Sequence, residues 1–340
     1  MIGKPFTLPD WHRVGGPVNA SGRIRVEPED FRVEERLGFE PSGDGQHHFL
    51  FVEKSLMDTE RAAVLLGRHA GVSRRAVSYS GLKDRRAVTR QWFSIEAPAT
   101  RSIDWQALDV DGLRVISNTR NQRKLRRGAH RENAFELVIR DLVDPDDGVD
   151  AALASIRDQG VPNYFGPQRF GREGGNIPLA EALFGGRKLP RHQKSIAISA
   201  ARSLIFNDLV SERVRQGSWN TLTDGDIANL AGSGSVFAVD RVDDDLARRC
   251  AEFDIHPTGP LWGRGAPGTS GMVAAAEQQA ADRYEVLRDG LERVAAEGRR
   301  ALRLRPADLT WERQADMLRM CFRLDRGAYA TAVVRELINL

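Results

Sequence analysis

The chain has 340 residues, which is long for one compact domain and enough for two, so it can bury a sizeable core. Hydrophobic residues make up 41% and charged residues 29%, which excludes an extensively disordered protein, and the net charge is only +3. Two cysteines far apart exclude a disulfide framework and a cysteine-rich zinc site, and a reducing cytoplasm is the expected compartment.

Short strands are predicted at the start of the chain. Apolar and charged residues alternate over 23–27 and again over 31–34, which predicts two half-buried strands on either side of a turn at Pro28. Residues 49–51 predict a further strand.

A helix is predicted next. Asp58 or Thr59 can cap it, its apolar residues recur at helical spacing, and Gly71 is placed to end it. Ser73 then opens a short turn that leads into a strand at 77–79.

The loop after this strand concentrates charge around one carboxylate, Asp84. Gly81 can bend the backbone there, and residues 91–95 leave the loop as a returning strand. Four cations flank the carboxylate: Lys83, Arg85, Arg86 and Arg90. Neighbouring positive charge favours an ionised carboxyl group whereas burial disfavours it, so we interpret Asp84 as an ionised candidate nucleophile in a site for a polyanion. A polar turn on a solvated surface is the alternative that this stretch leaves open.

Two further strands, 110–116 and 134–139, are predicted on either side of a basic run at 120–131. Asn133 and Phe135 are two residues apart and therefore lie on one face of the second strand. An amide and an aromatic ring beside many arginines suit a flat, hydrogen-bonding ligand such as a nucleobase. Packing of Phe135 in the core would explain the same spacing.

The middle of the chain is predicted to be a separate domain. A helix at 149–159 is followed by a loop at 160–171, whose three aromatic residues among glycines and prolines would either wedge two domains together or stack on bases. Beyond it we expect mostly helices, around 177–184, 195–216, 244–253 and 273–297.

The C-terminal segment returns to β structure. Alternation over 318–324 predicts a half-buried strand, and Gly327 turns the chain into a helix with one apolar face. One strand and one short helix cannot form a core alone, so we expect both to pack on the first domain. The middle region is then an insertion, and Tyr329 and Arg335 return toward Asp84.

Charge and motif content narrow the function. Basic residues cluster at 74–90, 120–131 and 187–194, as a phosphate-binding face would require, although solvated helix faces give the same count. The histidines show no metal-ligand spacing and there is no glycine-rich phosphate loop, so we expect no structural metal and no nucleotide cofactor. Without a long apolar run or a signal-like N-terminus, the chain is expected to be neither membrane-embedded nor secreted.

Five motifs, which occur in the right order along essentially the whole chain, together indicate a resemblance to a known family. Any one of them alone would be weak evidence. They are residues 28–35, 81–91, 124–135, 162–171 and 327–337. With these motifs the chain resembles the TruD family of tRNA pseudouridine synthases.

The resemblance implies an α+β fold. The expected catalytic domain has a mixed, mostly antiparallel sheet flanked by helices and is formed by residues 1–159 and 306–340. A mostly helical α/β insertion domain, residues 160–305, interrupts it. The implied activity is isomerisation of uridine to pseudouridine in tRNA, with uridine 13 as the expected target and without metal or cofactor.

The resemblance also implies roles for individual residues. Asp84 falls on the catalytic aspartate, while Phe31, Asn133 and Tyr329 fall on positions that bind the target uridine, and Phe135 on a ring that stacks against it. Many members have phenylalanine where this chain has Tyr329, which keeps the ring and adds a hydroxyl group.

Cations are expected in two roles around this site. Arg25, close to Phe31, is the first choice for the cation that keeps Asp84 ionised, and Arg335 is the second. Phosphate contacts are expected from Lys83, Arg85, Lys124, Arg126 and Arg127, and the basic run at 187–194 is expected to clamp the tRNA.

Two functions from different classes therefore remain. The first is an RNA isomerase in which Asp84 attacks C1′, attacks C6 or removes a sugar proton. The second is a non-catalytic tRNA-binding or folding factor, which the intact motif around Asp84 disfavours. A glycosidase-like hydrolase would need a second paired carboxylate, and the sequence shows none. We expect a cytoplasmic monomer that binds tRNA and has no obligate protein partner.

Overall fold

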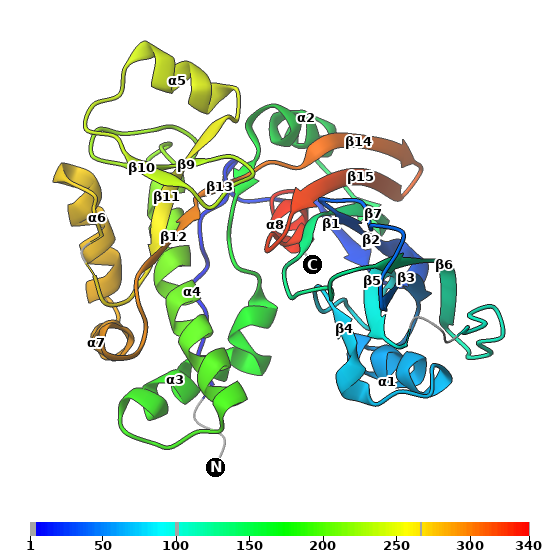
Figure 1. The fold of residues 1–340 in the computed structure, drawn as a ribbon. Helices are drawn as coiled ribbons and strands as arrows, with labels where there is room; N and C mark the ends of the chain where they lie inside the picture. Colours follow the sequence, from blue (N-terminus) through cyan, green and yellow to red (C-terminus); the bar gives the residue numbers. More distant parts are fainter. Residues whose placement is uncertain (1–4, 99–101, 266, 340) are drawn as a thin grey trace. The chain divides into compact units, whose positions relative to one another are not determined.

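The computed structural model describes residues 5–98, 102–265 and 267–339, and the chain divides into two units (Figure 1). The sheet unit comprises residues 19–147, 306–328 and 338–340. The helical unit comprises residues 1–18, 148–305 and 329–337. One division between the two units falls after Arg305. The first 18 residues, the helix before residue 160 and the C-terminal helix differ from the prediction, since they group with the middle region.

The sheet unit is built on one large sheet in the strand order β14-β15-β7-β2-β5-β3-β6, with β1 paired to β7 and β4 to β5. Its strands are β1 (Ser21–Ile24), β2 (Phe31–Leu37), β3 (His47–Lys54), β4 (Val77–Tyr79), β5 (Val88–Glu96), β6 (Leu113–Asn121), β7 (His130–Val143), β14 (Ala307–Gln314) and β15 (Met317–Asp325). Only β2 and β5 pair in parallel among the pairings of this sheet's described strands, so the predicted mixed, mostly antiparallel sheet is confirmed.

Helix α1 (Thr59–His69) covers one part of this sheet, as predicted. Asp58 caps it, since its Oδ1 accepts a hydrogen bond from the backbone N–H of Arg61 at 2.8 Å. Ala62 and Leu66 of the helix are fully buried with Leu50 of β3 in one hydrophobic cluster. Two short 3-10 helices, η1 (Pro28–Asp30) and η2 (Arg74–Ala76), precede β2 and β4.

The C-terminal strand completes the sheet, which confirms that it packs on the first domain. β15 pairs with β7 so that Phe322 lies opposite Phe135 and Leu318 opposite Ile139. Its partner strand β14 was not predicted, because Leu309 is its one buried residue and the alternation is therefore weak. Helix α8 (Ala330–Arg335) groups instead with the helical unit.

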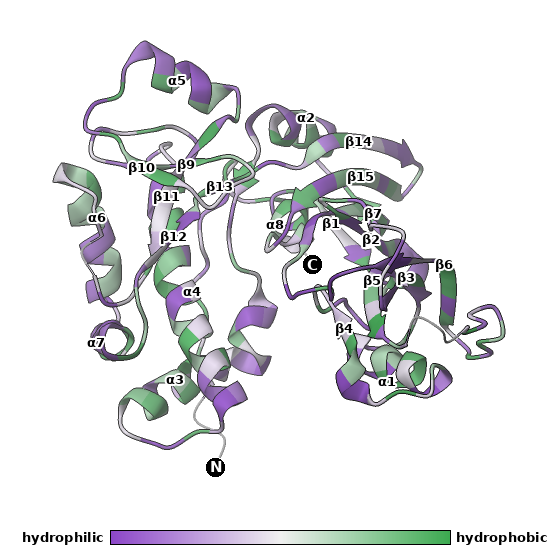
Figure 2. Cartoon of the chain, in the orientation of Figure 1, coloured by the Kyte–Doolittle hydropathy of each residue, from purple (hydrophilic) through white to green (hydrophobic). Residues whose placement is uncertain are grey.

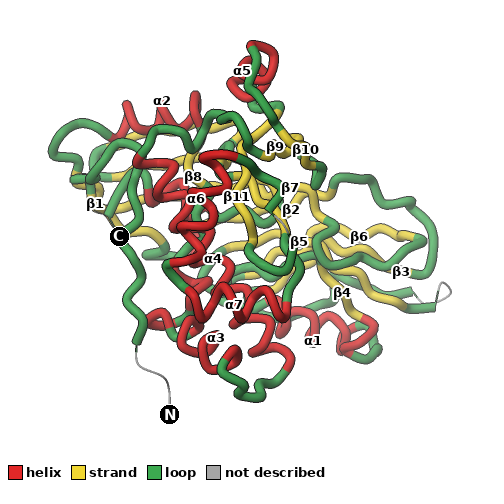
Figure 3. The backbone as a smooth tube through the Cα atoms, turned by 90° about the vertical axis from the view of Figure 1, so that its left-hand side faces the viewer, coloured by secondary structure: helices red, strands yellow, loops and turns green. Residues whose placement is uncertain are grey.

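The helical unit is organised around the long, largely buried helix α4 (Arg191–Arg215). Its other helices are α2 (Val149–Gln159), η3 (Pro167–Phe170), η4 (Arg172–Gly174), α3 (Asn176–Phe184), α5 (Asp244–Ala251), α6 (Gly271–Asp282) and α7 (Glu285–Val294). Figure 3 shows α3, α6 and α7 gathered around α4, with which each is in contact. Hydrophilic residues cover most of α5 (Figure 2), in which Cys250 is the buried residue.

The same unit contains a four-stranded sheet, in the order β10-β9-β11-β12, within a region predicted to be a mostly helical α/β domain whose strands the sequence did not locate. The short strands are β8 (Val161–Pro162), β9 (Ile227–Leu230), β10 (Val236–Ala238), β11 (Ile255–Leu261), β12 (Gly298–Ala301) and β13 (Arg303–Leu304). Pro257 and Pro260 lie in β11, and proline normally argues against a central strand. The single helix predicted at 273–297 is instead two helices, α6 and α7. The break lies at Tyr284, whose backbone is not helical.

The aromatic residues of the 160–171 loop lie inside the helical unit. Tyr164, Phe165 and Phe170 are at most 7% exposed and belong to its hydrophobic core together with Trp11. The Trp11 ring centroid lies 6.0 Å from that of Tyr164 and 5.6 Å from that of Phe170. Base stacking by these three rings, one of the two predicted roles, is therefore wrong. Among the described residues, no helix has the length and apolar character needed to cross a membrane.

Candidate active site

The loop that carries Asp84 joins β4 to β5, as predicted, and side chains from several elements hold it. The backbone N–H of Lys83 donates to Thr59 Oγ1 at 3.0 Å, and Gln91 Nε2 donates to the Gly81 carbonyl at 3.2 Å. The carbonyl of Ser80 accepts a hydrogen bond from the Gly128 N–H at 2.8 Å. The loop is thus fixed to α1, β5 and the basic loop that precedes β7.

The carboxylate of Asp84 is oriented at both oxygens and stays accessible. Its Oδ1 accepts the backbone N–H of Arg86 at 2.9 Å, and its Oδ2 lies 3.1 Å from Nη2 of Arg25. The side chain is 34% exposed, so a substrate can reach it. Two partners that hold a partly open carboxylate are what a preorganised catalytic group needs.

Arg25 connects this carboxylate to an aromatic residue. Its guanidinium carbon lies 4.2 Å from the ring centroid of Phe31, and its side chain is 21% exposed. The backbone at Arg25 has φ 59, a left-handed conformation that costs a non-glycine residue about 1–2 kcal/mol. Such strain is concentrated at functional sites, where the surrounding structure maintains it.

A buried lysine that the sequence analysis missed holds the backbone of Asp84. Lys54 is fully buried at the end of β3, and its Nζ donates to the Asp84 carbonyl at 2.9 Å and to the Met57 carbonyl at 2.7 Å. Burial lowers the pKa of Lys54 to about 8, while the nearby charges of Asp84 and Asp58 oppose that change. The signal in the sequence was the alternation of β3, which places Lys54 on the same face as Leu50.

Lys83 is not available to phosphates, contrary to the prediction. Its Nζ lies 2.5 Å from Oε2 of Glu35, and the two side chains are 7% and 0% exposed. Burial raises the pKa of Glu35, whereas the charge and hydrogen bond of Lys83 lower it. Burial also lowers the pKa of the neighbouring His130 to about 4. The pair is therefore a buried ion pair that positions the loop.

The predicted base-binding residues Phe31, Asn133 and Phe135 share one face of strands β2 and β7. Phe31 is 4% exposed and meets Phe135 edge to face, with ring centroids 6.3 Å apart. Phe135 is 8% exposed and stacks on Phe322 at 5.4 Å, so core packing accounts for much of its surface. Within the described chain, Oδ1 of Asn133 is buried without a hydrogen-bond partner, and such an acceptor costs about 1–3 kcal/mol unless a ligand satisfies it.

Tyr329 and Arg335 lie in the helical unit, where neighbours of that unit hold them. The Tyr329 hydroxyl pairs with Arg169, and its ring centroid lies 6.1 Å from that of Phe165. Arg335 donates to the His12 carbonyl at 3.2 Å, and its guanidinium lies 4.5 Å from the Tyr164 ring centroid. Their approach to Asp84 stays a prediction.

The remaining predicted phosphate contacts are on the surface of the sheet unit. Arg85, Lys124, Arg126 and Arg127 are all exposed. The guanidinium of Arg127 covers the Tyr79 ring at 3.9 Å, which fixes it beside the strand that leads to Asp84.

Comparison with known proteins gives a consistent result. The family model for tRNA pseudouridine synthase D (TruD) matches residues 18–184 and 179–337. The chain is 46% identical over 345 residues to a tRNA pseudouridine synthase D of Methylococcus capsulatus, covering 100% of this chain and 98% of the relative. It is 44% identical over 321 residues to that of Pseudomonas syringae pv. syringae, covering 93% and 91%.

Structural comparison supports the fold independently. A crystal structure from Methanosarcina mazei, described as a candidate tRNA pseudouridine synthase D, matches with a TM-score of 0.73 over 100% of this chain and 97% of that one. At 20% identity this likeness concerns the fold alone.

Proposed function

Because the chain belongs to the tRNA pseudouridine synthase D family of enzymes, which isomerise uridine to pseudouridine in tRNA, we propose that it modifies uridine 13 with Asp84 as the catalytic carboxylate. The observation that carries the assignment of Asp84 is its geometry. The carboxylate is 34% exposed, it accepts the Arg86 N–H, and it lies 3.1 Å from Nη2 of Arg25.

The reaction fits a site with a single accessible carboxylate. The N1–C1′ bond of uridine breaks, the uracil turns, and a C5–C1′ bond forms; the C5 proton leaves to solvent and N1 gains a proton. Nothing is oxidised or reduced, so one group that assists departure and return of the base is sufficient. Asp84 is that group, and Arg25 orients it and balances its charge.

Asp84 can assist in three ways: by attack on C1′, by addition to C6, or by removal of the C2′ proton. Uridine deuterated at C2′ separates the third way from the other two. A primary isotope effect on the single-turnover rate assigns removal of the C2′ proton, whereas nucleophilic attack by Asp84 predicts none.

The target base must leave its stack to reach Asp84, and the freed uracil must be held while it turns. Phe31 and Phe135 of the sheet unit hold the uracil in this proposal, and stacking of the one base contributes about 1–3 kcal/mol. The family resemblance adds Tyr329 as a further residue that binds the target uridine. The unpaired Oδ1 of Asn133 is an acceptor for the uracil N3–H. The role of Arg335, the second-choice cation, stays a prediction, since its Nη1 lies 2.7 Å from Oε1 of Glu336 within the helical unit.

Phosphate contacts supply affinity that depends on salt and not on sequence. We assign them to the exposed Arg85, Lys124, Arg126 and Arg127 of the sheet unit, and to the run at 187–194 of the helical unit, whose basic residues are also exposed. We place the enzyme in the cytoplasm, as a monomer without an obligate protein partner.

Tritium release from C5 of uridine-labelled tRNA tests this proposal. Wild type and an Asp147→Asn control, whose side chain is 93% exposed, should release tritium, whereas Asp84→Asn should bind tRNA without release. A tRNA with cytidine at position 13 should release none. Release by Asp84→Asn would refute the role of this residue, and undiminished release from the cytidine tRNA would refute the target position.

A further inference from the structure

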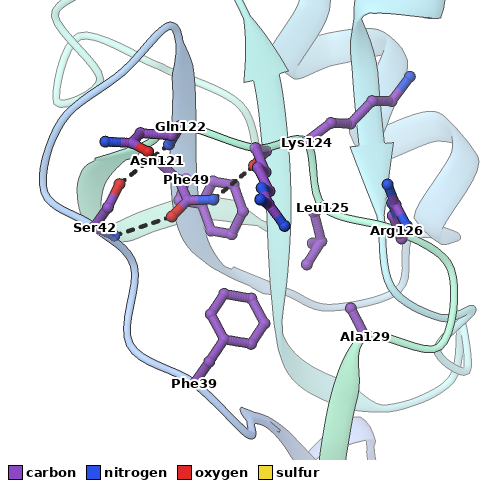
Figure 4. A pocket seen from close by; sticks show the side chains of 10 residues that line it. Phe39, Ser42, Phe49, Asn121, Gln122, Lys124, Leu125, Arg126 and Ala129 are labelled. Atoms are coloured by element: carbon purple, nitrogen blue, oxygen red, sulfur yellow. Dashed lines mark hydrogen bonds between the residues drawn. The ribbon is translucent and has the colours of Figure 1, made fainter.

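A pocket of about 490 Å³ lies on the sheet unit, and Figure 4 shows the side chains that line it. This loop pocket is lined by Phe39, Phe49, Asn121, Gln122, Leu125 and Ala129, with three cations beside it. Phe49 alternates along β3 with Leu50 and Lys54, which face α1 and the Asp84 loop. Because successive side chains of a strand point to opposite faces, the pocket is distinct from the active site.

The walls of the loop pocket are preformed. Oδ1 of Asn121 accepts the Ser42 N–H at 2.9 Å, and Ser42 Oγ accepts the Gln122 N–H at 3.1 Å, so the two loops are joined directly. Gly45 has φ +104, and a Cβ there would lie 2.6 Å from the Asn121 carbonyl oxygen, which makes this close approach possible only for glycine. A ligand would bind without having to order the walls first.

One aromatic ring that lines the pocket is exposed to solvent. Phe39 is 43% exposed, while Phe49 beneath it is fully buried, and the two rings meet edge to face with centroids 6.4 Å apart. Figure 4 shows these rings on one side of the hollow and Leu125 and Ala129 across from them. An exposed ring above an apolar floor offers a stacking surface that accepts any base.

The cations beside this ring are free to bind an anion. Arg123, Lys124 and Arg126 are exposed, and in the described ranges no carboxylate lies within ion-pair distance of them. Arg90 on the same sheet, by contrast, is ion-paired, since its Nε lies 2.9 Å from Glu53 Oε2. A flat apolar surface beside unpaired guanidinium groups is complementary to a nucleotide, with its base and its phosphate.

We propose that the loop pocket binds one unpaired nucleotide of the tRNA, other than the target uridine, with its base on Phe39 and its phosphates on Arg123 and Arg126. The inference rests on the proposed function, because it takes tRNA as the substrate. The pocket also connects to the catalytic loop, since Gly128, two residues beyond Arg126, donates to the Ser80 carbonyl. A nucleotide held here therefore fixes the register of the tRNA relative to Asp84.

The first test measures tRNA affinity by fluorescence anisotropy for Phe39→Ala, Phe39→Tyr and Phe237→Ala. Loss of one stacked base predicts a roughly 5- to 150-fold higher Kd for Phe39→Ala. Phe39→Tyr keeps the ring and should bind as wild type does. Phe237 is a matched control, a phenylalanine that is 36% exposed in the helical unit, and its replacement should have no effect.

A scan of tRNAs with single abasic sites then identifies the bound nucleotide. In wild type, one abasic position other than 13 should weaken binding, and in Phe39→Ala that position should have no further effect. Weaker binding by Phe39→Ala with an unchanged abasic profile would overturn the proposal, as would wild-type affinity of this variant. The exposed Arg123→Gln/Arg126→Gln pair should lower the salt slope of binding by about 1–2, and an unchanged slope counts against the phosphate contacts. Tritium release by wild type reports on the proposed function separately.

Discussion

Replacing Lys54 by methionine tests whether a buried cation holds the Asp84 loop in its active conformation. Methionine nearly preserves the volume and apolar stem of the side chain but removes the ammonium group that contacts the carbonyls of Asp84 and Met57. A hydrogen bond to a charged group contributes about 1.5–3 kcal/mol. If the active conformation depends on the bond to the Asp84 carbonyl, the rate should fall roughly 10- to 150-fold.

Stability should change much less than activity. The lowering of the Lys54 pKa from 10.5 to about 8 corresponds to roughly 3 kcal/mol of unfavourable charge burial. Lys54→Met removes this cost together with the two hydrogen bonds, and because the two effects oppose each other, the free energy of unfolding should change by less than about 2 kcal/mol at pH 7.

The pH dependence of the free energy of unfolding tests whether the charge of Lys54 is buried at a cost. Between pH 8 and 10.5 the unfolded chain retains the Lys54 proton while the folded chain loses it, so wild-type stability should rise with pH relative to Lys54→Met. The stability difference between wild type and Lys54→Met should increase by roughly 3 kcal/mol over this pH range. The stability difference between wild type and the exposed control Lys194→Met should show no such increase. Denaturant titrations and single-turnover tritium release provide the measurements. A wild-type rate for Lys54→Met would refute the positioning role, and a stability difference independent of pH would refute the charge burial.

Three further variants test other parts of the structure. Arg25→Gln should lower the single-turnover rate at least about tenfold while tRNA binding persists, because Asp84 loses its charged partner; an unchanged rate contradicts this. Glu35→Gln leaves the ammonium of Lys83 buried without a counter-charge, so denaturant unfolding should show a loss of about 3–5 kcal/mol, and Glu35→Gln/Lys83→Met should recover part of it. Gly259→Ala places a Cβ 2.9 Å from Leu209 Cδ2, so thermal unfolding should show a loss of about 1–3 kcal/mol, whereas Gly148→Ala, with open space, is its control.

Local signals in the sequence were sufficient for much of the sheet unit. Asp58 begins α1 because its side chain satisfies a free N–H of the first turn. Alternation identified β2 and β15 because each buries one face. The motif around Asp84 pointed to its position in a loop between paired strands, since a glycine and a charged run interrupt two apolar stretches.

Local signals were misleading where distant contacts determine the structure. No strand was predicted at β11, whose two prolines are unusual in a strand with neighbours on both sides, yet β11 pairs with β9 and β12 and is largely buried. The aromatic residues of the 160–171 loop suited base stacking, but the core of the helical unit buries them with Trp11, which is far away in the sequence.

The sequence by itself determined the family, the sheet with its C-terminal strand, and Asp84 as the candidate catalytic group, because these depend on patterns within short segments. Only the tertiary structure decided which charges surround Asp84. Lys83, beside it in the sequence, is buried against Glu35, while Lys54, thirty residues away, donates to its carbonyl. The physical reason is that burial and pairing of a charge depend on which strands meet in the sheet, and that pairing joins segments whose separation in sequence carries no local signal.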